Sequence, residues 1–228
     1  MRREWPWERR PALQVALDLT NLEEALKIAR AAWANGAELL EAGTPLIKAV
    51  GAEAVRALRR NFPDAVVVAD TKIMDAGRLE ASTALEAGAD IVTVLGVASD
   101  ETIRDVVEAA HEHGALAAVD MINHPDPLAR SKKVAELGAD IIILHVAVDV
   151  QKARGLDARQ ALPLVPRIRE ETGRWIAVAG GLNKDTAPLA AKAGADILIV
   201  GSAITKARDP AKATREIIEA LKGIKKGQ

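Results

Sequence analysis

Residues 193–202 read AGADILIVGS: a glycine, an alanine and an acidic residue, followed by a short apolar run. The same pattern occurs three more times, as NGAELLEAG at 35–43, AGADIVTVLG at 87–96 and LGADIIILHV at 137–146. The four glycines are spaced by 52, 50 and 56 residues. Short apolar runs that follow a glycine are typical of buried β-strands, so the repeat predicts four strands at regular intervals.

Four further apolar runs alternate with these repeats: LQVALDL at 13–19, VVVAD at 66–70, ALAAVDM at 115–121 and WIAVAGG at 175–181. The intervening stretches are rich in Ala, Glu, Lys and Arg at helical spacing, and several end at Gly. Eight strand–helix units predict an α/β fold, the (β/α)8 TIM barrel. A doubly wound open sheet is the alternative, and the near-equal spacing favours closure.

The composition limits the classes of protein to be considered. No linker interrupts residues 1–228, so we expect a single domain. The net charge of −1 predicts no nucleic-acid and no membrane partner. The absence of cysteine excludes disulfides and thiolate chemistry, and the N-terminus lacks the apolar core of a signal peptide. We therefore expect a cytoplasmic protein.

Residues 1–12 precede the first strand and contain Trp5 and Trp7 among several arginines. We expect this segment to close the bottom of the barrel, with the indoles packed and the arginines in solvent. A nucleic-acid-binding tail is the alternative interpretation.

Polar residues gather where the predicted strands end, and in TIM barrels this C-terminal face carries the chemistry. A lone acid there can instead be a helix N-cap, acids and a lysine can form a surface ion-pair cluster, and a histidine can be a buried core residue. Because they all fall at strand ends, we favour a shared site. The candidates are Asp18, Glu41, Asp70, Lys72, Asp75, Asp120, His145, Gly180, Gly181, Gly201 and Ser202.

The residue types predict a reaction class. Glu41 and Asp70 lie on adjacent strands and are hard oxygen ligands that suit Mg²⁺. Lys72 can stabilise a developing oxyanion, and His145 can transfer protons near neutral pH. The pairs Gly180–Gly181 and Gly201–Ser202 fall on the two loops that often bind phosphate in barrels. The set predicts proton abstraction next to the carbonyl of a sugar phosphate.

The segment DTKIMD at 70–75 resembles the D-x-K-x-x-D signature of the orotidine-monophosphate decarboxylase superfamily. Within it, LLEAGTPLIK, VVADTKIMDAG, LHVAVDVQ and VAGGL resemble the 3-hexulose-6-phosphate synthase family. The likeness runs from about Leu13 to about Ile218. It implies an aldolase that joins formaldehyde to ribulose 5-phosphate with Mg²⁺ or Mn²⁺.

The resemblance also implies roles for single residues. Glu41 and Asp70 would bind the metal, Lys72 would contact the enediolate, and His145 would transfer protons. Asp18 and Asp75 would position substrate and lysine, and Asp120 would lie near the substrate. Gly180, Gly181, Gly201 and Ser202 would hold the phosphate. It further implies a homodimer in which Asp75 reaches the partner's site, whereas by itself Asp75 could equally be a helix N-cap.

Three positions depart from family patterns. Val148 and Ser202 stand where the related 3-keto-L-gulonate 6-phosphate decarboxylases carry arginines, which disfavours that alternative. Ala147 and Ser202 stand where synthases usually have Gly. A non-catalytic or engineered barrel that retains the rim without the activity is the remaining alternative.

Overall fold

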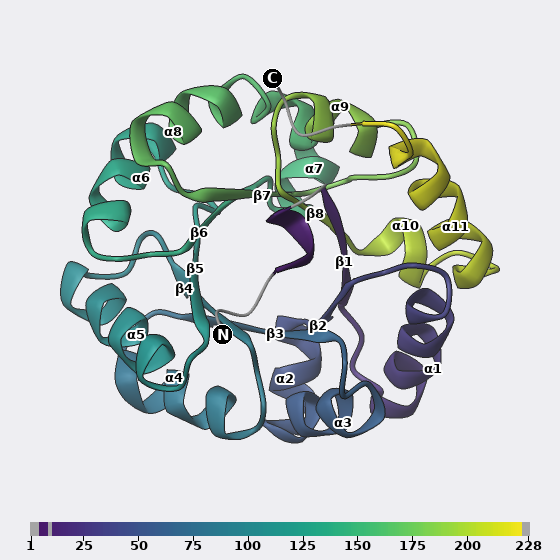
Figure 1. Ribbon diagram of the computed structural model, residues 1–228, viewed down its shortest axis with the longest axis horizontal. Coiled ribbons are helices and arrows are strands. Elements are labelled where there is room, and N and C mark those ends of the chain that lie inside the picture. The colour runs from purple at the N-terminus through teal and green to yellow at the C-terminus, as the bar shows by residue number, and fades with distance from the viewer. Residues whose placement is uncertain (1–4, 9–10, 225–228) are drawn as a thin grey trace.

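The chain folds into a closed barrel of eight parallel strands. The computed structural model describes residues 5–8 and 11–224. The strands follow one another in sequence order, and β1 pairs with β8, which closes the ring (Figure 1). The predicted TIM barrel is confirmed, and the open doubly wound sheet is excluded. The strands are β1 (Ala12–Leu17), β2 (Leu39–Ala42), β3 (Val66–Ile73), β4 (Ile91–Leu95), β5 (Leu116–Asp120), β6 (Ile141–His145), β7 (Trp175–Ala179) and β8 (Ile197–Val200).

The α-helices surround the barrel on the outside, whereas the short N-terminal helix η1 lies inside the ring of strands (Figure 1). The side chains of Asn21, Ser99, Asp126 and Asp209 each accept a backbone N–H in the first turn of the helix that follows, which fixes where those helices begin. The helices are η1 (Pro6–Glu8), α1 (Leu22–Trp33), α2 (Thr44–Val50), α3 (Glu53–Asn61), α4 (Gly77–Glu86), α5 (Asp100–Glu112), α6 (Pro127–Glu136), α7 (Val148–Arg154), η2 (Ala158–Gln160), α8 (Leu164–Thr172), α9 (Ala187–Lys192), α10 (Ser202–Thr205) and α11 (Pro210–Leu221).

The acidic residues of the repeat join neighbouring units at the start of the strands. Asp90, Asp140 and Asp196 each accept, at 2.7 to 2.9 Å, the N–H of the second residue of the strand before their own. The same carboxylates form ion pairs or hydrogen bonds with helix side chains, which are Arg59, His111 and Arg169 respectively. The repeat is therefore a structural device that fixes strand to strand and strand to helix.

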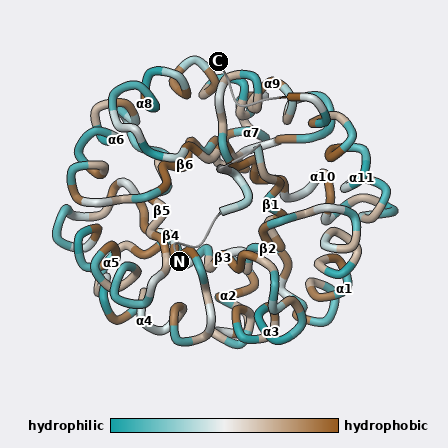
Figure 2. Tube along the Cα trace, in the orientation of Figure 1, coloured by the Kyte–Doolittle hydropathy of each residue, from teal (hydrophilic) through white to brown (hydrophobic). Residues whose placement is uncertain are grey.

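The apolar residues form two layers, because side chains alternate between the two faces of each strand. The outer layer packs the strands against the helices, and Figure 2 shows the apolar colour along the strands and the polar colour on the outer turns of the helices. The inner layer lines the barrel with many short side chains, among them Ala16, Ala118, Ala177 and Ala179. Small inward residues leave room along the barrel axis.

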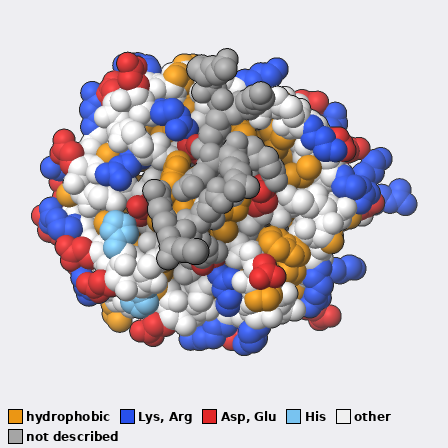
Figure 3. Space-filling model, in the orientation of Figure 1, with side chains coloured by type: hydrophobic (Ala, Val, Ile, Leu, Met, Phe, Trp, Pro, Cys, Tyr) orange, Lys and Arg blue, Asp and Glu red, His pale blue; other side chains and the backbone are white. Residues whose placement is uncertain are grey.

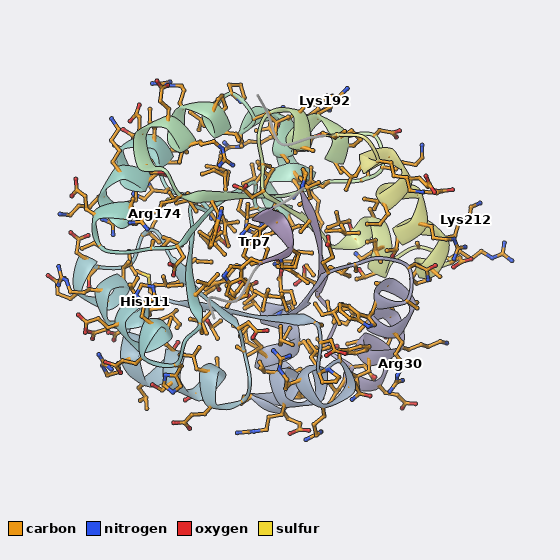
Figure 4. All side chains as sticks on the ribbon, in the orientation of Figure 1. Trp7, Arg30, His111, Arg174, Lys192 and Lys212 are labelled. Carbon is orange, nitrogen blue, oxygen red and sulfur yellow. The ribbon has the colours of Figure 1, made fainter. Side chains whose placement is uncertain are left out.

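Tryptophans occupy that room at the N-terminal end of the strands. Trp5 and Trp7 stack with ring centroids 5.1 Å apart, and Trp175 meets Trp7 edge-on at 5.5 Å. Trp7 is completely buried, and Figure 4 shows it inside the ring of strands. Because both N-terminal indoles are buried, they are not available to stack on nucleic-acid bases. Residues 1–4 and 9–10 of the segment expected to close the barrel lie outside the described residues.

Charged side chains ring the edge of the face shown in Figure 3. Within residues 5–8 and 11–224, no helix combines the length and the apolar character needed to cross a bilayer.

Candidate active site

Four of the candidate residues share one geometric property: they occupy inward-facing positions at the C-terminal ends of the strands. Alternation along each strand directs Glu41, Asp70, Asp120 and His145 into the barrel, on the same face as the inner apolar layer. The opposite end of the barrel holds the tryptophans, so the polar groups converge on one rim only.

Glu41 is buried in the wall of this rim, with 5% of its surface exposed. Its Oε2 accepts a hydrogen bond from Gln14 Nε2 at 2.5 Å. Burial raises the pKa of Glu41 well above its usual range, and the nearby carboxylates of Asp70 and Asp18 raise it further. Lys72 and the Gln14 amide offset only part of this effect.

Asp70 has hydrogen-bond donors on both carboxylate oxygens. Its Oδ1 accepts from the Thr93 hydroxyl at 2.9 Å, and its Oδ2 accepts from the Thr44 hydroxyl at 2.7 Å and from Lys72 Nζ at 2.5 Å. Only 9% of the side chain is exposed. Asp70 is buried and Lys72 is half-buried, so this pair is not a surface ion-pair cluster.

Lys72 reaches the site through an unusual backbone. Lys72 has a backbone φ of +47°, in the left-handed region. Its Nζ lies 2.5 Å from Asp70 Oδ2 and 3.5 Å from Asp120 Oδ2. Burial opposes the ammonium form, but Asp70 and then Asp120 outweigh that effect and raise the pKa of Lys72. The amine is held as a cation.

His145 and Asp120 form a hydrogen-bonded pair beneath the rim. His145 Nδ1 lies 2.9 Å from Asp120 Oδ2, and Asp120 Oδ1 accepts the N–H of Ile122. Burial opposes ionisation of Asp120, but His145 and Lys72 outweigh it and lower the pKa of Asp120. An ionised carboxylate can only accept, so Nδ1 carries the proton, and in the neutral imidazole Nε2 is the nitrogen that can accept one. The side chain of His145 is 21% exposed, which makes it a rim residue and not a sealed core residue.

Asp18 lies between the ends of β2 and β8. A Cβ on Gly43 would stand 2.3 Å from Asp18 Oδ1, and one on Gly201 would stand 3.4 Å from Oδ2. The absence of a side chain at Gly43 therefore leaves the space that the Asp18 carboxylate occupies. Partial burial, followed by the charge of Asp70, raises the pKa of Asp18. The N-cap of α1 is Asn21, so Asp18 does not cap that helix.

Asp75 is not brought into the site of its own chain. It is exposed, its Oδ1 accepts the N–H of Ala76, and it forms no ion pair with any described residue. The N-cap position of α4 is Ala76, and no side chain caps that helix. The interpretation of Asp75 as an N-cap is therefore wrong. Exposed apolar side chains flank it, with Met74 at 53% and Leu79 at 71% exposure.

The loops after β7 and β8 contain the predicted glycines and Ser202. Gly180 and Gly181 have φ of +110° and +76°, conformations that favour glycine. A Cβ on Gly180 would lie 2.5 Å from the carbonyl oxygen of Val146, so part of the reason for glycine is close packing against the segment after β6. Ser202 is exposed and begins α10 directly after Gly201.

The carboxylates fit a divalent cation by their chemistry. The charge of Asp70 raises the pKa of both Glu41 and Asp18, Asp18 also raises the pKa of Glu41, and the Lys72 ammonium offsets only part of these effects. A hard cation would relieve this excess of negative charge. No group of three or more His, Asp or Glu side chains in the described part of the chain is arranged as a metal site. Mg²⁺ usually binds through one or two protein carboxylates and keeps several waters, so the pair Glu41 and Asp70 suits this ion.

Sequence reasoning missed three polar residues that support the site: Gln14, Thr44 and Thr93. Gln14 and Thr93 are 4% and 2% exposed and lie in the otherwise apolar runs LQVAL and IVTVL. Both side chains lie on the inward face of their strand, as do the candidate residues at the strand ends. A polar residue at an inward position of an apolar strand is the signal that could have found these two. Thr44 follows Gly43 at the start of α2 and offers no comparable signal.

Comparisons with known proteins match nearly the whole chain. The model of the orotidine 5'-phosphate decarboxylase / HUMPS family matches residues 11–217. The 3-hexulose-6-phosphate synthase of Mycobacterium gastri is 42% identical over 209 residues, which cover 92% of this chain and 99% of that protein.

Solved structures are similar over the same range. The 3-hexulose-6-phosphate synthase from Salmonella typhimurium superposes with a TM-score of 0.87 at 40% identity, covering 92% of this chain and 98% of that one. A structure of KGPDC from Streptococcus mutans gives a TM-score of 0.87 at 31% identity, covering 94% of this chain and 98% of that one.

Proposed function

The chain belongs to the orotidine 5'-phosphate decarboxylase / HUMPS family and is an enzyme, and we propose that it is an aldehyde-lyase that joins formaldehyde to D-ribulose 5-phosphate and catalyses the reverse cleavage. Relatives named 3-hexulose-6-phosphate synthase, similar over almost their whole length, support this activity.

The observation that carries the proposal is the surroundings of Lys72. A permanently charged ammonium lies between Asp70 and Asp120, and Asp120 holds His145 with Nε2 free to accept a proton. A base and a fixed cation on one rim are what enolisation of a keto sugar requires. A charged lysine is also unsuited to forming a Schiff base, because that chemistry needs the neutral amine.

The reaction then follows from the roles of these side chains. His145 Nε2 removes a proton from C1 of ribulose 5-phosphate, and Lys72 stabilises the resulting enediolate oxygens. The nucleophilic C1 attacks the carbon of formaldehyde and forms the new C–C bond. The formaldehyde oxygen takes up a proton and becomes a hydroxyl group, so that no redox partner is needed. Asp120 acts as a positioning residue, because it is buried beneath the groups that would meet substrate.

Glu41 and Asp70 would hold Mg²⁺ or Mn²⁺. When bound, the ion would supply Lewis-acid polarisation of the substrate oxygens. Asp18 is partly exposed and its charge acts on Glu41, which suits contact with substrate hydroxyl groups at this place. Gly180, Gly181, Gly201 and Ser202 would bind the phosphate through backbone N–H groups and the serine hydroxyl.

A homodimer with shared sites is part of the proposal. Asp75 has no ionic partner among the described residues of its own chain and stands between exposed Met74 and Leu79. An exposed carboxylate with apolar neighbours suits an interface at which Asp75 meets the partner's Lys72.

The decisive test is turnover of formaldehyde and ribulose 5-phosphate in the presence of Mg²⁺, with and without excess chelator. Asp70→Asn should lower kcat/KM by about 10²- to 10³-fold, which is typical for the loss of one group that stabilises transition-state charge. Glu136→Gln, a change to an exposed carboxylate on α6, is the control and should leave turnover unchanged. Full activity in excess chelator would refute the metal requirement.

Decarboxylation of 3-keto-L-gulonate 6-phosphate is the second candidate, favoured by the structural similarity to KGPDC. Val148 argues against it. This residue begins α7 after His145, is 57% exposed, and cannot donate a proton or a hydrogen bond from its side chain. Comparable kcat/KM values for decarboxylation and for aldol addition would favour this second candidate.

A further inference from the structure

We propose that Thr93 is a positioning residue that holds both Lys72 and Asp70 in their working geometry. The inference rests on the proposed function for the roles of those two residues. The hydrogen bonds of Thr93 that support the inference involve neither substrate nor metal.

The pairing of β3 with β4 is irregular at this point. Ala69 pairs with Val92 and Ile73 pairs with Val94, so three residues of β3 stand opposite the single residue Thr93. A bulge of this kind leaves backbone and side-chain groups without ladder partners and redirects the strand. The stretch it redirects is Asp70–Thr71–Lys72, the start of the superfamily-like motif.

Thr93 provides a partner for each of the three residues. Its Oγ1 accepts the backbone N–H of Lys72 at 2.9 Å and donates to Asp70 Oδ1 at 2.9 Å. Its backbone carbonyl oxygen accepts the Thr71 hydroxyl at 2.8 Å. A hydroxyl has one proton to donate and two lone pairs, so it can make both bonds at once. Because Asp70 Oδ1 can only accept, the direction of each bond is fixed.

The bond to Lys72 matters because of the backbone conformation there. A left-handed conformation is unfavourable for a residue with a side chain and persists where surrounding contacts enforce it. The bond from Thr93 fixes the amide of Lys72 in this conformation. The side chain then leaves the strand in a direction that brings Nζ to both Asp70 and Asp120.

The bond to Asp70 sets the rotation of a carboxylate that we assign as a metal ligand. Thr93 is 2% exposed, so water has no route to replace a lost hydroxyl at this place. A single buried hydroxyl thus couples the orientation of the lysine to that of the acid.

Thr93→Val tests the hydroxyl at nearly constant shape, Thr93→Ser retains the hydroxyl, and Thr214→Val is the matched control. Thr214 is also completely buried, and its hydroxyl donates to the carbonyl oxygen of Pro210 at 2.8 Å, in α11 and far from the rim. The probes are Mn²⁺ alone, whose dissociation constant is measured by electron paramagnetic resonance on metal-free protein, and kcat and KM for the aldol reaction.

Thr93→Val should weaken Mn²⁺ binding and lower kcat, each by about ten- to a hundredfold, since a hydrogen bond to a charged group is lost. KM should change less than kcat. Thr93→Ser and Thr214→Val should stay within threefold of the unmodified chain in both measurements. If Thr93→Val does not fold, Thr93→Ala replaces it as the variant without a hydroxyl.

Unchanged Mn²⁺ affinity and kcat in the variant without the hydroxyl would overturn the proposal. A Thr93→Ser variant as impaired as Thr93→Val would also overturn it, because shape and not the hydroxyl would then be responsible. If the unmodified chain binds Mn²⁺ but does not turn over the two substrates, the proposed function fails while the affinities still decide the role of Thr93. If the unmodified chain binds no Mn²⁺, the role toward Asp70 is refuted.

Discussion

Replacing Glu41 by glutamine should stabilise the metal-free protein while it removes the response to metal. Glu41 is 5% exposed and lies among the like charges of Asp70 and Asp18, which Lys72 and Gln14 offset only in part. Glutamine has nearly the same shape and still offers an oxygen to the Gln14 amide. Relief of an uncompensated buried charge should raise the free energy of unfolding at pH 8 by about 1–3 kcal/mol.

The pH dependence gives the sign of this effect. A carboxyl group whose folded-state pKa is raised stabilises the fold below its ordinary pKa and loses that contribution as pH rises through the raised value. Each unit of difference is worth about 1.4 kcal/mol. The advantage of Glu41→Gln should therefore be small near pH 4.5 and should grow toward pH 8. The lowered pKa of Asp120 acts in the opposite direction but is common to both proteins.

Denaturant unfolding at both pH values, with chelator and with Mg²⁺, tests this reasoning. At a Mg²⁺ concentration one hundred times the dissociation constant, the unmodified chain should gain about 2.7 kcal/mol, and Glu41→Gln should gain much less. Glu136→Gln, which removes an exposed carboxylate, serves as the control for a change of net charge. A metal-free Glu41→Gln protein that is less stable than the unmodified chain at pH 8 would refute the assignment of Glu41 as a carboxylate under like-charge repulsion.

Three further predictions concern other parts of the molecule. Trp7→Ala should lower the free energy of unfolding by about 3–5 kcal/mol and leave kcat within twofold, because the indole is buried at the end of the barrel away from the site; a loss below about 1 kcal/mol in denaturant unfolding would contradict this packing role. Val148→Arg should raise decarboxylation of 3-keto-L-gulonate 6-phosphate relative to aldol addition in paired kcat/KM assays, and an unchanged ratio would argue against a role for this position. Lys72→Ala and Asp75→Asn should each be inactive alone, and unfolding and refolding them together should restore activity, because half of the heterodimer sites would be intact; a mixture that stays inactive although heterodimers form would exclude the shared site.

The sequence by itself determined the eight strands, the helices between them and the rim on which the polar residues meet. These features follow from local patterns, namely short apolar runs, helical spacing and the repeated glycine and acid, and from the general rule that barrel chemistry lies at the strand ends. The sequence located the ends of the strands less accurately than the strands themselves. The apolar run of β3 stops at Ala69, but the strand continues to Ile73 because Thr93 on the neighbouring strand provides hydrogen-bond partners for the polar residues.

Only the tertiary structure decided which groups touch and what charge they carry. The hydrogen bonds from Gln14 to Glu41 and between Asp120 and His145 each join residues more than twenty positions apart in the sequence. The left-handed backbone of Lys72 depends on a contact of the same kind, with Thr93. The pKa of Glu41 depends on burial and on the sum of neighbouring charges, and neither can be read from residues adjacent in sequence. The order of residues along the chain sets the spacing of apolar and polar side chains in each helix and strand. Electrostatic interactions and hydrogen bonds instead act through space, between groups that come together only when the barrel closes.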